Sequence, residues 1–142
     1  SNSNIKRKFK AEIIRSGYSQ VNIMGIVACR AAYSGGLEWL KELKEYLAGN
    51  LEYLRSFLKN RLPHIKLIEP QGTYLVWLDF SALGLDDKEL DDLMVYKAGL
   101  WLDAGTMFGA GGEGFQRINI ACPRSVLEKA LNQIEQAVNQ LG

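Results

Sequence analysis

Apolar residues recur at helical spacing through the first part of the chain. In the segment 5–15 they stand four residues apart, which predicts an amphipathic helix with a basic outer face. The segment 23–33 is apolar on nearly every side, and Asn22 in front of it is a suitable helix N-cap. A helix of this composition is expected to be buried, either against the body of the protein or against a partner.

The longest periodic segment is 37–62. Its apolar stripe is expected to consist of leucines at spacings of three and four, namely Leu40, Leu43, Leu47, Leu51, Leu54 and Leu58. At ~1.5 Å per residue such a helix would be ~39 Å long. A coiled coil is the alternative, but the segment holds only about three heptads, which favours a helix lying along a domain. Pro63 ends the segment.

After this proline the helical period gives way to the alternation of β-strands. The segments 64–69 and 73–80 are predicted to be strands, joined by a turn at 69–72 that has proline in its second position. The second strand is apolar at every position of 74–78. It is therefore expected to be a central strand that is covered on both faces.

Two further strands and two helices are predicted in the remainder of the chain. A capping box of the Asp-x-x-Glu kind begins at Asp86, and one of the Ser-x-x-Glu kind begins at Ser125. Each precedes an amphipathic helix, the last of which has an apolar stripe expected to run to Leu141. Between them the segments 100–103 and 115–121 are predicted to be strands on either side of a glycine-rich loop.

The order of elements is therefore three helices followed by β-β-α-β-β-α. This order predicts an α/β protein in the broad sense, with helices and strands in one layered structure. Its small domain is expected to be of the α+β class, with a small sheet covered by helices on one side. A length of 142 residues fits one domain, 1–142. Within it we expect connecting or interface helices at 1–36, the long helix at 37–62 and a small α/β domain at 63–142.

Composition excludes several classes of function. The net charge of +1 does not indicate nucleic-acid binding. No apolar run reaches the ~18 residues of a membrane span, and no signal peptide is visible, so a cytoplasmic protein is expected. His64 is the only histidine, which argues against Ser-His-Asp or Cys-His catalysis. The acidic residues at 86–92 lack calcium-loop spacing, so no metal site is predicted. Cys29 and Cys122 are expected to be reduced, packed thiols.

The strand 115–121 carries an arginine among apolar residues. Because alternate residues of a strand share a face, Arg117 and Asn119 are expected on the same side. Guanidinium binds carboxylates through a two-pronged pair of hydrogen bonds, and the glycine-rich loop before the strand would let a ligand approach closely. The pattern thus fits an anion-binding arginine. An edge arginine that only reaches solvent fits the spacing equally well.

The glycine-rich loop also matches a dinucleotide-binding pattern. Residues 109–114 read Gly-Ala-Gly-Gly-Glu-Gly, which satisfies G-x-G-x-x-G. That pattern binds a pyrophosphate only when a helix follows it, because the helix N-terminus holds the anion. Here a strand is predicted to follow, and the acidic residue about 20 positions on, Glu135, lies within a helical pattern. A dinucleotide site is therefore rejected.

Three segments closely resemble the C-terminal part of the MalY/PatB-type C–S lyases. They are Glu69–Phe80, Gly105–Gly109 and Gly112–Arg124, and the segments 22–33 and 38–40 are also similar. These lyases are pyridoxal-phosphate (PLP) enzymes of the class I/II aminotransferase fold. The Phe-x-Arg-x-Asn-x-Ala strand is shared with aminotransferases broadly, whereas the longer Glu-Gly-Phe-x-Arg-x-Asn-Ile-Ala-Cys-Pro form is typical of the lyases.

The resemblance implies the small, C-terminal domain of this fold. In the family the Schiff-base lysine and the other cofactor-binding groups lie in the large domain, which would precede this chain. We therefore assign no catalytic or cofactor-binding residue here and expect the chain alone to be inactive. PLP is expected in the full-length enzyme, as an electron sink for loss of a sulfur group from Cβ of an amino acid. A homodimer is also implied.

The resemblance gives a role to one arginine and its neighbour. Arg117 matches the family arginine that binds the substrate α-carboxylate, and Asn119 would support it from the same face. Two alternatives to the lyase remain open. One is the small domain of a PLP-dependent aminotransferase. The other is a stand-alone module that binds carboxylates or serves as an interaction domain, with 22–33 as an oligomer interface.

Overall fold

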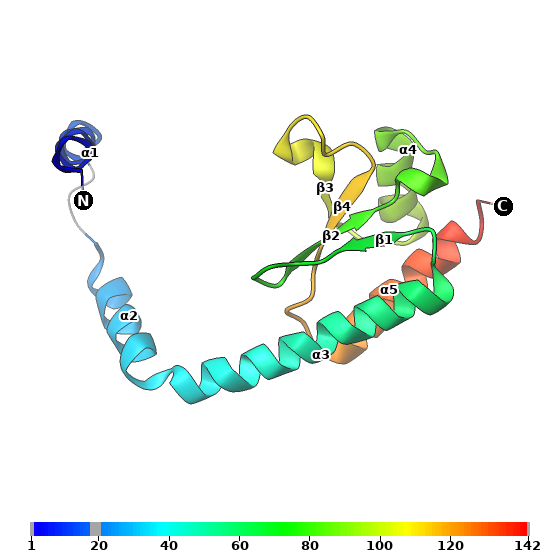
Figure 1. Cartoon of the computed structure of the whole chain (residues 1–142), viewed down its shortest axis with the longest axis horizontal. Helices are drawn as coiled ribbons and strands as arrows, with labels where there is room; N and C mark the ends of the chain where they lie inside the picture. Colours follow the sequence, from blue (N-terminus) through cyan, green and yellow to red (C-terminus); the bar gives the residue numbers. More distant parts are fainter. Residues whose placement is uncertain (1, 18–20, 142) are drawn as a thin grey trace. The chain divides into compact units, whose positions relative to one another are not determined.

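The computed structural model describes residues 2–17 and 21–141, in two compact units that comprise 1–42 and 43–142 (Figure 1). The helices are α1 (Ser3–Arg15), α2 (Ile23–Gly35), α3 (Leu37–Arg61), α4 (Asp87–Asp92) and α5 (Arg124–Val138). The strands are β1 (Lys66–Ile68), β2 (Leu75–Asp79), β3 (Asp103–Ala104) and β4 (Phe115–Asn119). Short helical turns are η1 (Ser81–Leu83), η2 (Leu93–Lys97) and η3 (Gly105–Phe108). No helix in the described ranges has the length and apolarity needed to cross a membrane.

The helices of the first unit begin and end where local signals place them. The Asn22 side chain accepts a hydrogen bond of 2.7 Å from the Gly25 N–H, so the predicted N-cap of α2 is confirmed. Helix α1 is followed by Gly17 at φ +72°, a left-handed conformation that costs glycine little. Helix α2 continues two residues past the predicted end at 33 and stops before Gly36.

Helix α2 is apolar but has no buried residue. Its own unit therefore does not provide the burial predicted for 23–33, and burial by another part of the protein or by a partner stays a prediction. Cys29 on this helix is exposed, so the expectation of a packed thiol is wrong there, whereas Cys122 is half-buried. Both cysteines are free.

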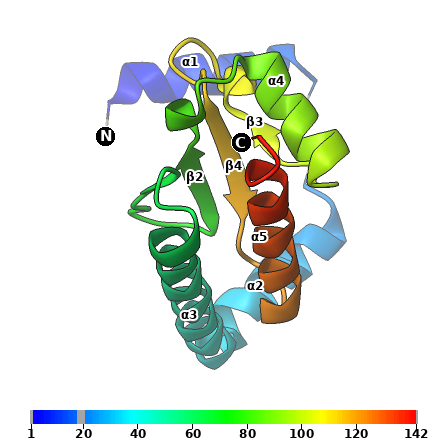
Figure 2. The same cartoon turned by 90° about the vertical axis from the view of Figure 1, so that its right-hand side faces the viewer.

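The second unit is an α+β layer, as predicted. Its four strands form an antiparallel sheet in the order β1-β2-β4-β3. The part of α3 that belongs to this unit lies beside α5 on one face of the sheet, with α4 on the same side (Figure 2). The core between these layers includes Leu54 and Leu58 of α3 and Leu131 and Ile134 of α5, and all four are buried.

The central strand β2 is covered by helices on one face only. Val76 and Leu78 point to the helices and are fully buried, whereas Leu75 and Trp77 on the opposite face are half-buried. The prediction that this strand is covered on both faces is therefore wrong within the unit 43–142. Its continuous apolar run reflects a core on one side and an aromatic surface on the other. The predicted strand at 100–103 is also shorter, since only its last residue lies in β3.

The two capping boxes have different outcomes. The Asp86 box is confirmed, with both of its reciprocal hydrogen bonds present. The Ser125 box is wrong, because the N-cap is Pro123, two residues earlier, and α5 begins at Arg124. The hydroxyl of Tyr46 on α3 instead accepts a 2.8 Å hydrogen bond from the Arg124 N–H. A side chain from a distant helix thus satisfies a donor of the first turn.

The buried side chain of Asn50 joins α3 to the segment between β4 and α5. Its amide donates to the carbonyls of Ile120 (2.8 Å) and Cys122 (3.0 Å). Its own oxygen accepts from Nε of Arg124 at 2.9 Å. The predicted apolar stripe of α3 is buried only from Asn50 onward, at Leu54 and Leu58, whereas Leu40 near the start of the helix is 45% exposed. Leu141, the predicted end of the stripe of the last helix, is likewise exposed.

Replacing Asn50 with alanine is expected to destabilise the second unit. The change leaves two inward carbonyls and a guanidinium without their partner, and an unsatisfied buried polar group costs ~1–3 kcal/mol. We expect the free energy of unfolding to fall by about 2–4 kcal/mol, measured by urea denaturation. Asn60→Ala, at an exposed position of the same helix, is the matched control and should change it by less than about 0.5 kcal/mol. Equal losses in the two variants would contradict this role.

Candidate functional site

Strand register brings three side chains into one row on the face of the sheet away from the helices. Arg117 of β4 pairs directly with Trp77 of β2 on one side and with Asp103 of β3 on the other. Direct partners in an antiparallel pair project to the same face with their Cβ atoms about 4.5–5.5 Å apart. The neighbouring β4 residues Gln116 and Ile118 are buried on the helix side, which confirms the predicted division of faces.

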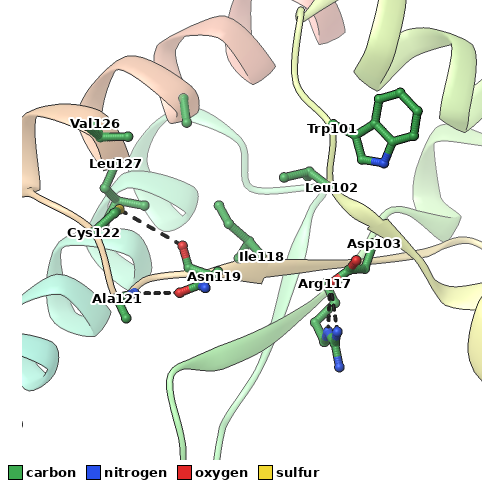
Figure 3. Close-up of a pocket in the computed structure, with 11 residues that line it drawn as sticks. Trp101, Leu102, Asp103, Arg117, Ile118, Asn119, Ala121, Cys122, Val126 and Leu127 are labelled. Carbon is green, nitrogen blue, oxygen red and sulfur yellow. Dashed lines mark hydrogen bonds and ion pairs between the residues drawn. The ribbon is translucent and has the colours of Figure 1, made fainter.

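The guanidinium of Arg117 is held along one edge by Asp103 (Figure 3). Its Nε donates to Oδ2 of Asp103 at 3.1 Å, and its Nη2 donates to the same oxygen at 2.7 Å. The arginine side chain is 24% exposed and the aspartate side chain 42% exposed. The arginine therefore does not simply extend into solvent. It is fixed in a partly buried position in which charge-assisted hydrogen bonds are stronger than in water.

Two aromatic rings flank the same guanidinium. Its Cζ lies 4.4 Å from the centroid of the Phe108 ring and 6.0 Å from that of Trp77. The two rings meet edge to face, with centroids 5.1 Å apart and planes at 88°. Cations are attracted to aromatic faces at such distances. The rings thus restrict the directions from which a ligand can reach the arginine.

The sequence interpretation assigned no role to Asp103 or Trp77, and it included Phe108 only as part of the segment 105–109, whose resemblance to the lyases places it on the substrate side. The sequence did contain a signal for Asp103. It is the single acidic residue at the end of the apolar segment 100–103, and Arg117 is the single arginine within the apolar segment 115–121. Opposite charges in two apolar strands favour a pairing between those strands. No comparable sequence signal identifies Phe108, whose position depends on the path of η3 after β3.

Two backbone segments of the glycine-rich loop cross at close range, and this crossing fixes the path of the loop. A Cβ built on Gly105 would lie 2.0 Å from the carbonyl oxygen of Gly112, and one built on Gly112 would lie 2.1 Å from that of Gly105. Only glycine fits at either position. This crossing sets where η3 begins and hence where Phe108 lies over Arg117. Strand β4 follows the loop, so the geometry of a dinucleotide-binding loop is absent at this point of the chain.

Asn119 lies on the same face as Arg117 but is bonded locally. Its Oδ1 accepts a 2.8 Å hydrogen bond from the Ala121 N–H (Figure 3). It pairs with Leu75, which lies two residues along β2 from Trp77, the partner of Arg117. Any support that Asn119 gives to a ligand would therefore come from its amide nitrogen.

Two hollows adjoin the row of side chains. One of about 440 Å³ is lined by Ile68, Trp77, Phe108, Phe115 and the glycines of the loop. The other, of about 310 Å³, lies at the edge of β4 and is lined by Arg117, Asn119, Trp101 and Cys122, among others (Figure 3). Burial raises the pKa of the Cys122 thiol, which keeps it protonated and unsuited to act as a nucleophile.

Comparison with known proteins finds relatives along nearly the whole chain, although no protein-family model matches it. The chain is 41% identical over 134 residues to the cystathionine beta-lyase PatB of Bacillus subtilis (strain 168), covering 94% of this chain and 35% of that protein. It is 36% identical over 124 residues to the protein MalY of Escherichia coli (strain K12), covering 87% and 32%. An aspartate aminotransferase of Pyrococcus horikoshii is 33% identical over 133 residues, covering 92% and 33%.

Comparison with solved structures also finds a protein that is similar in both fold and sequence. Cystalysin from Treponema denticola, whose crystal structure contains pyridoxal 5'-phosphate, matches with a TM-score of 0.90 and 33% identity over 100% of this chain and 36% of that one. The fold of the second unit is that of the C-terminal domain of the PLP-dependent aminotransferase-fold enzymes. The chain spans about a third of the length of the relatives it matches.

The residues of this chain do not by themselves fit PLP. The cofactor is held in such enzymes by a Schiff base to a lysine, which requires a lysine enclosed in the site. All ten lysines of the chain are exposed, and none lines either hollow beside Arg117. No PLP-binding residue is therefore assigned within the described ranges.

Replacing Gly112 with alanine is expected to disturb the site through the loop crossing. The added Cβ would meet the Gly105 carbonyl at 2.1 Å, so the backbones must separate. We expect a loss of about 1–3 kcal/mol in the free energy of unfolding and a change in the near-ultraviolet circular dichroism of the Trp77–Phe108 pair. Gly72→Ala is the matched control, since a Cβ there meets nothing within 4 Å. An unchanged aromatic signal in Gly112→Ala would refute the proposed placement of Phe108 by this crossing.

Proposed function

We propose that this chain, which is related over nearly its whole length to the C-terminal part of the MalY/PatB-type C–S lyases, binds the substrate carboxylate in a PLP-dependent lyase. The reaction would be the cleavage of a Cβ–S bond in an amino acid of the cystathionine type. One observation carries the proposal. Arg117 is partly buried on the open face of the sheet, and Asp103 takes up only one edge of its guanidinium.

The chemistry of this arginine suits a substrate α-carboxylate. A guanidinium offers five N–H donors, of which two are used by Asp103. The remaining donors can form a pair of parallel hydrogen bonds with a carboxylate, an interaction of about 1.5–3 kcal/mol. Fixing the carboxylate sets the direction of the other substituents on Cα, so the role of this chain is orientation of the substrate.

The cofactor belongs to the proposed full-length enzyme. When bound, PLP supplies an electron sink for charge that develops at Cα of the substrate. We further propose a homodimeric, cytoplasmic enzyme. Support for the dimer comes from α2, whose exposed apolar side chains, including Ile23 and Met24, are suited to a subunit interface.

A second candidate is the small domain of a PLP-dependent aminotransferase. The match to an aspartate aminotransferase favours it, because this relative is aligned over 92% of the chain. Binding of a substrate carboxylate by Arg117 serves both reactions equally. Product analysis of the full-length protein separates them, since a lyase releases pyruvate, ammonia and a thiol from cystathionine, whereas an aminotransferase converts a 2-oxo acid to an amino acid.

In the full-length enzyme, Arg117→Ala is expected to raise the KM for the amino-acid substrate and lower kcat/KM by at least about 10–100-fold. The loss of a charge-assisted pair and the resulting misplacement of the substrate both contribute. Arg117→Lys should restore little, because a point charge cannot replace the planar fork. PLP absorption should persist in both variants, since the expected cofactor-binding groups lie in the other domain.

Arg61 supplies a matched control for this experiment. It pairs with Glu135 and lies 4.6 Å from the centroid of the Phe57 ring, on the helical side of the same unit. Arg61→Ala is expected to lower the melting temperature while leaving kcat/KM nearly unchanged. If Arg117→Ala behaves in the same way, with normal kinetics in the folded enzyme, the carboxylate-binding role is excluded.

The 142-residue chain alone is expected neither to hold PLP as a Schiff base nor to turn over cystathionine. Its exposed lysines provide no enclosed site, so borohydride reduction in the presence of PLP should give only scattered, substoichiometric adducts. Peptide mapping by mass spectrometry makes the measurement. A single stoichiometric pyridoxyl-lysine would contradict the assignment of the cofactor site to another part of the full-length enzyme.

A further inference from the structure

We propose that Asp103 is a positioning residue, which holds the guanidinium of Arg117 in the orientation that accepts the substrate carboxylate. The inference rests on the proposed function and adds to it a residue that acts through the arginine and need not touch the substrate. Its basis is the register of β3 on β4, which places the two residues directly opposite each other.

The geometry of the pair leaves one defined edge of the guanidinium available. Asp103 binds the side formed by Nε and Nη2, and both hydrogen bonds end on a single carboxylate oxygen, Oδ2. Both protons of Nη1 and the second proton of Nη2 then remain, and these lie along the end of the group. That end can form a two-pronged interaction with a carboxylate while the aspartate stays in place.

The surrounding contacts restrict the guanidinium further. The ring of Phe108 lies 4.4 Å from Cζ, and Trp77 packs edge to face against that ring. Asp103 is fixed in turn by its strand, because β3 consists of this residue and Ala104, both paired with β4. Loss of the aspartate would leave a long side chain free to rotate against the rings. The expected consequence is a misplaced carboxylate and a lower rate of reaction.

The pair has two other interpretations, and each predicts a different outcome. Asp103 could compete with the substrate for the arginine, in which case its removal would tighten substrate binding. It could instead serve stability alone, in which case its removal would lower the melting temperature and leave the kinetics of the folded enzyme unchanged. The Asp103 side chain is half-exposed, which argues against a role in stability alone, since ion pairs near solvent contribute little to stability.

The test uses the full-length holoenzyme with L-cystathionine and three substitutions of Asp103. Asp103→Ala removes both hydrogen bonds and is expected to raise KM about tenfold and to lower kcat as well. Asp103→Asn retains an oxygen acceptor in the same place and is expected to restore KM to within about threefold of the parent. Asp103→Glu keeps the charge but moves the acceptor, so it should behave like alanine and provides the test if the alanine variant does not fold.

Asp92 provides the matched control. It is also an aspartate in an ion pair, with Lys88 on α4, and its side chain is 45% exposed. Asp92→Ala and Asp92→Asn are expected to leave both KM and kcat unchanged. Melting temperatures of all variants are measured on the same preparations, so that a loss of folding is separated from a loss of orientation.

The outcomes separate this inference from the proposed function. A normal or lowered KM in both Asp103→Ala and Asp103→Glu overturns the positioning role, provided that Arg117→Ala raises KM in parallel. If Arg117→Ala itself leaves KM unchanged, the carboxylate-binding function fails and the inference fails with it. A raised KM in the alanine and glutamate variants, restored in the asparagine variant, supports both.

Discussion

The pairing register of β2, β4 and β3 is the constraint on which the site depends. It sets Arg117 between an aromatic residue and a carboxylate, because Trp77 and Asp103 are its direct cross-strand partners. Side chains along a strand alternate between the two faces of the sheet, so a shift by one residue would turn the arginine into the helix-packed core. The same shift would bring Ile118 to the open face. The register therefore decides the chemistry of the face and the integrity of the core together.

Burial on the opposite face holds this register in place. Val76, Leu78 and Ile118 pack under α3 and α5, and any other register would expose some of them to water. The Asn50 side chain also helps to hold the register, since its amide donates hydrogen bonds to the Ile120 and Cys122 carbonyls and so fixes the position of the chain where it leaves β4. The site thus consists of polar and aromatic residues presented by a sheet whose other face supplies the stability.

The arginine is prepared for a ligand at little cost to the fold. A charge enclosed without partners would be strongly destabilising, and a fully exposed one would be mobile and screened by salt. Arg117 lies between these limits, with a carboxylate on one edge and the Phe108 ring over it. The close crossing at Gly105 and Gly112 keeps that ring in position without any side chain of its own. Such an arrangement favours binding of a carboxylate from one direction.

The sequence by itself determined the features that depend on neighbouring residues. The N-caps at Asn22 and Asp86 are set by hydrogen bonds that span three residues, and the face that Arg117 shares with Asn119 follows from the two-residue period of a strand. The α+β class followed from the order of such elements. The carboxylate-binding role came from the resemblance to a family, because spacing alone left a solvent-exposed arginine equally open.

Only the tertiary structure decided the features that depend on distant residues. The cap of α5 comes from Tyr46, which is 78 residues from its donor at Arg124, so the local Ser125 signal was misleading. The open face of β2 depends on which side the helices pack, and an apolar run does not reveal that. Asp103 meets Arg117 because two strands pair in one register, and that register is selected by burial summed over the whole core. Short-range patterns carry no information about that sum.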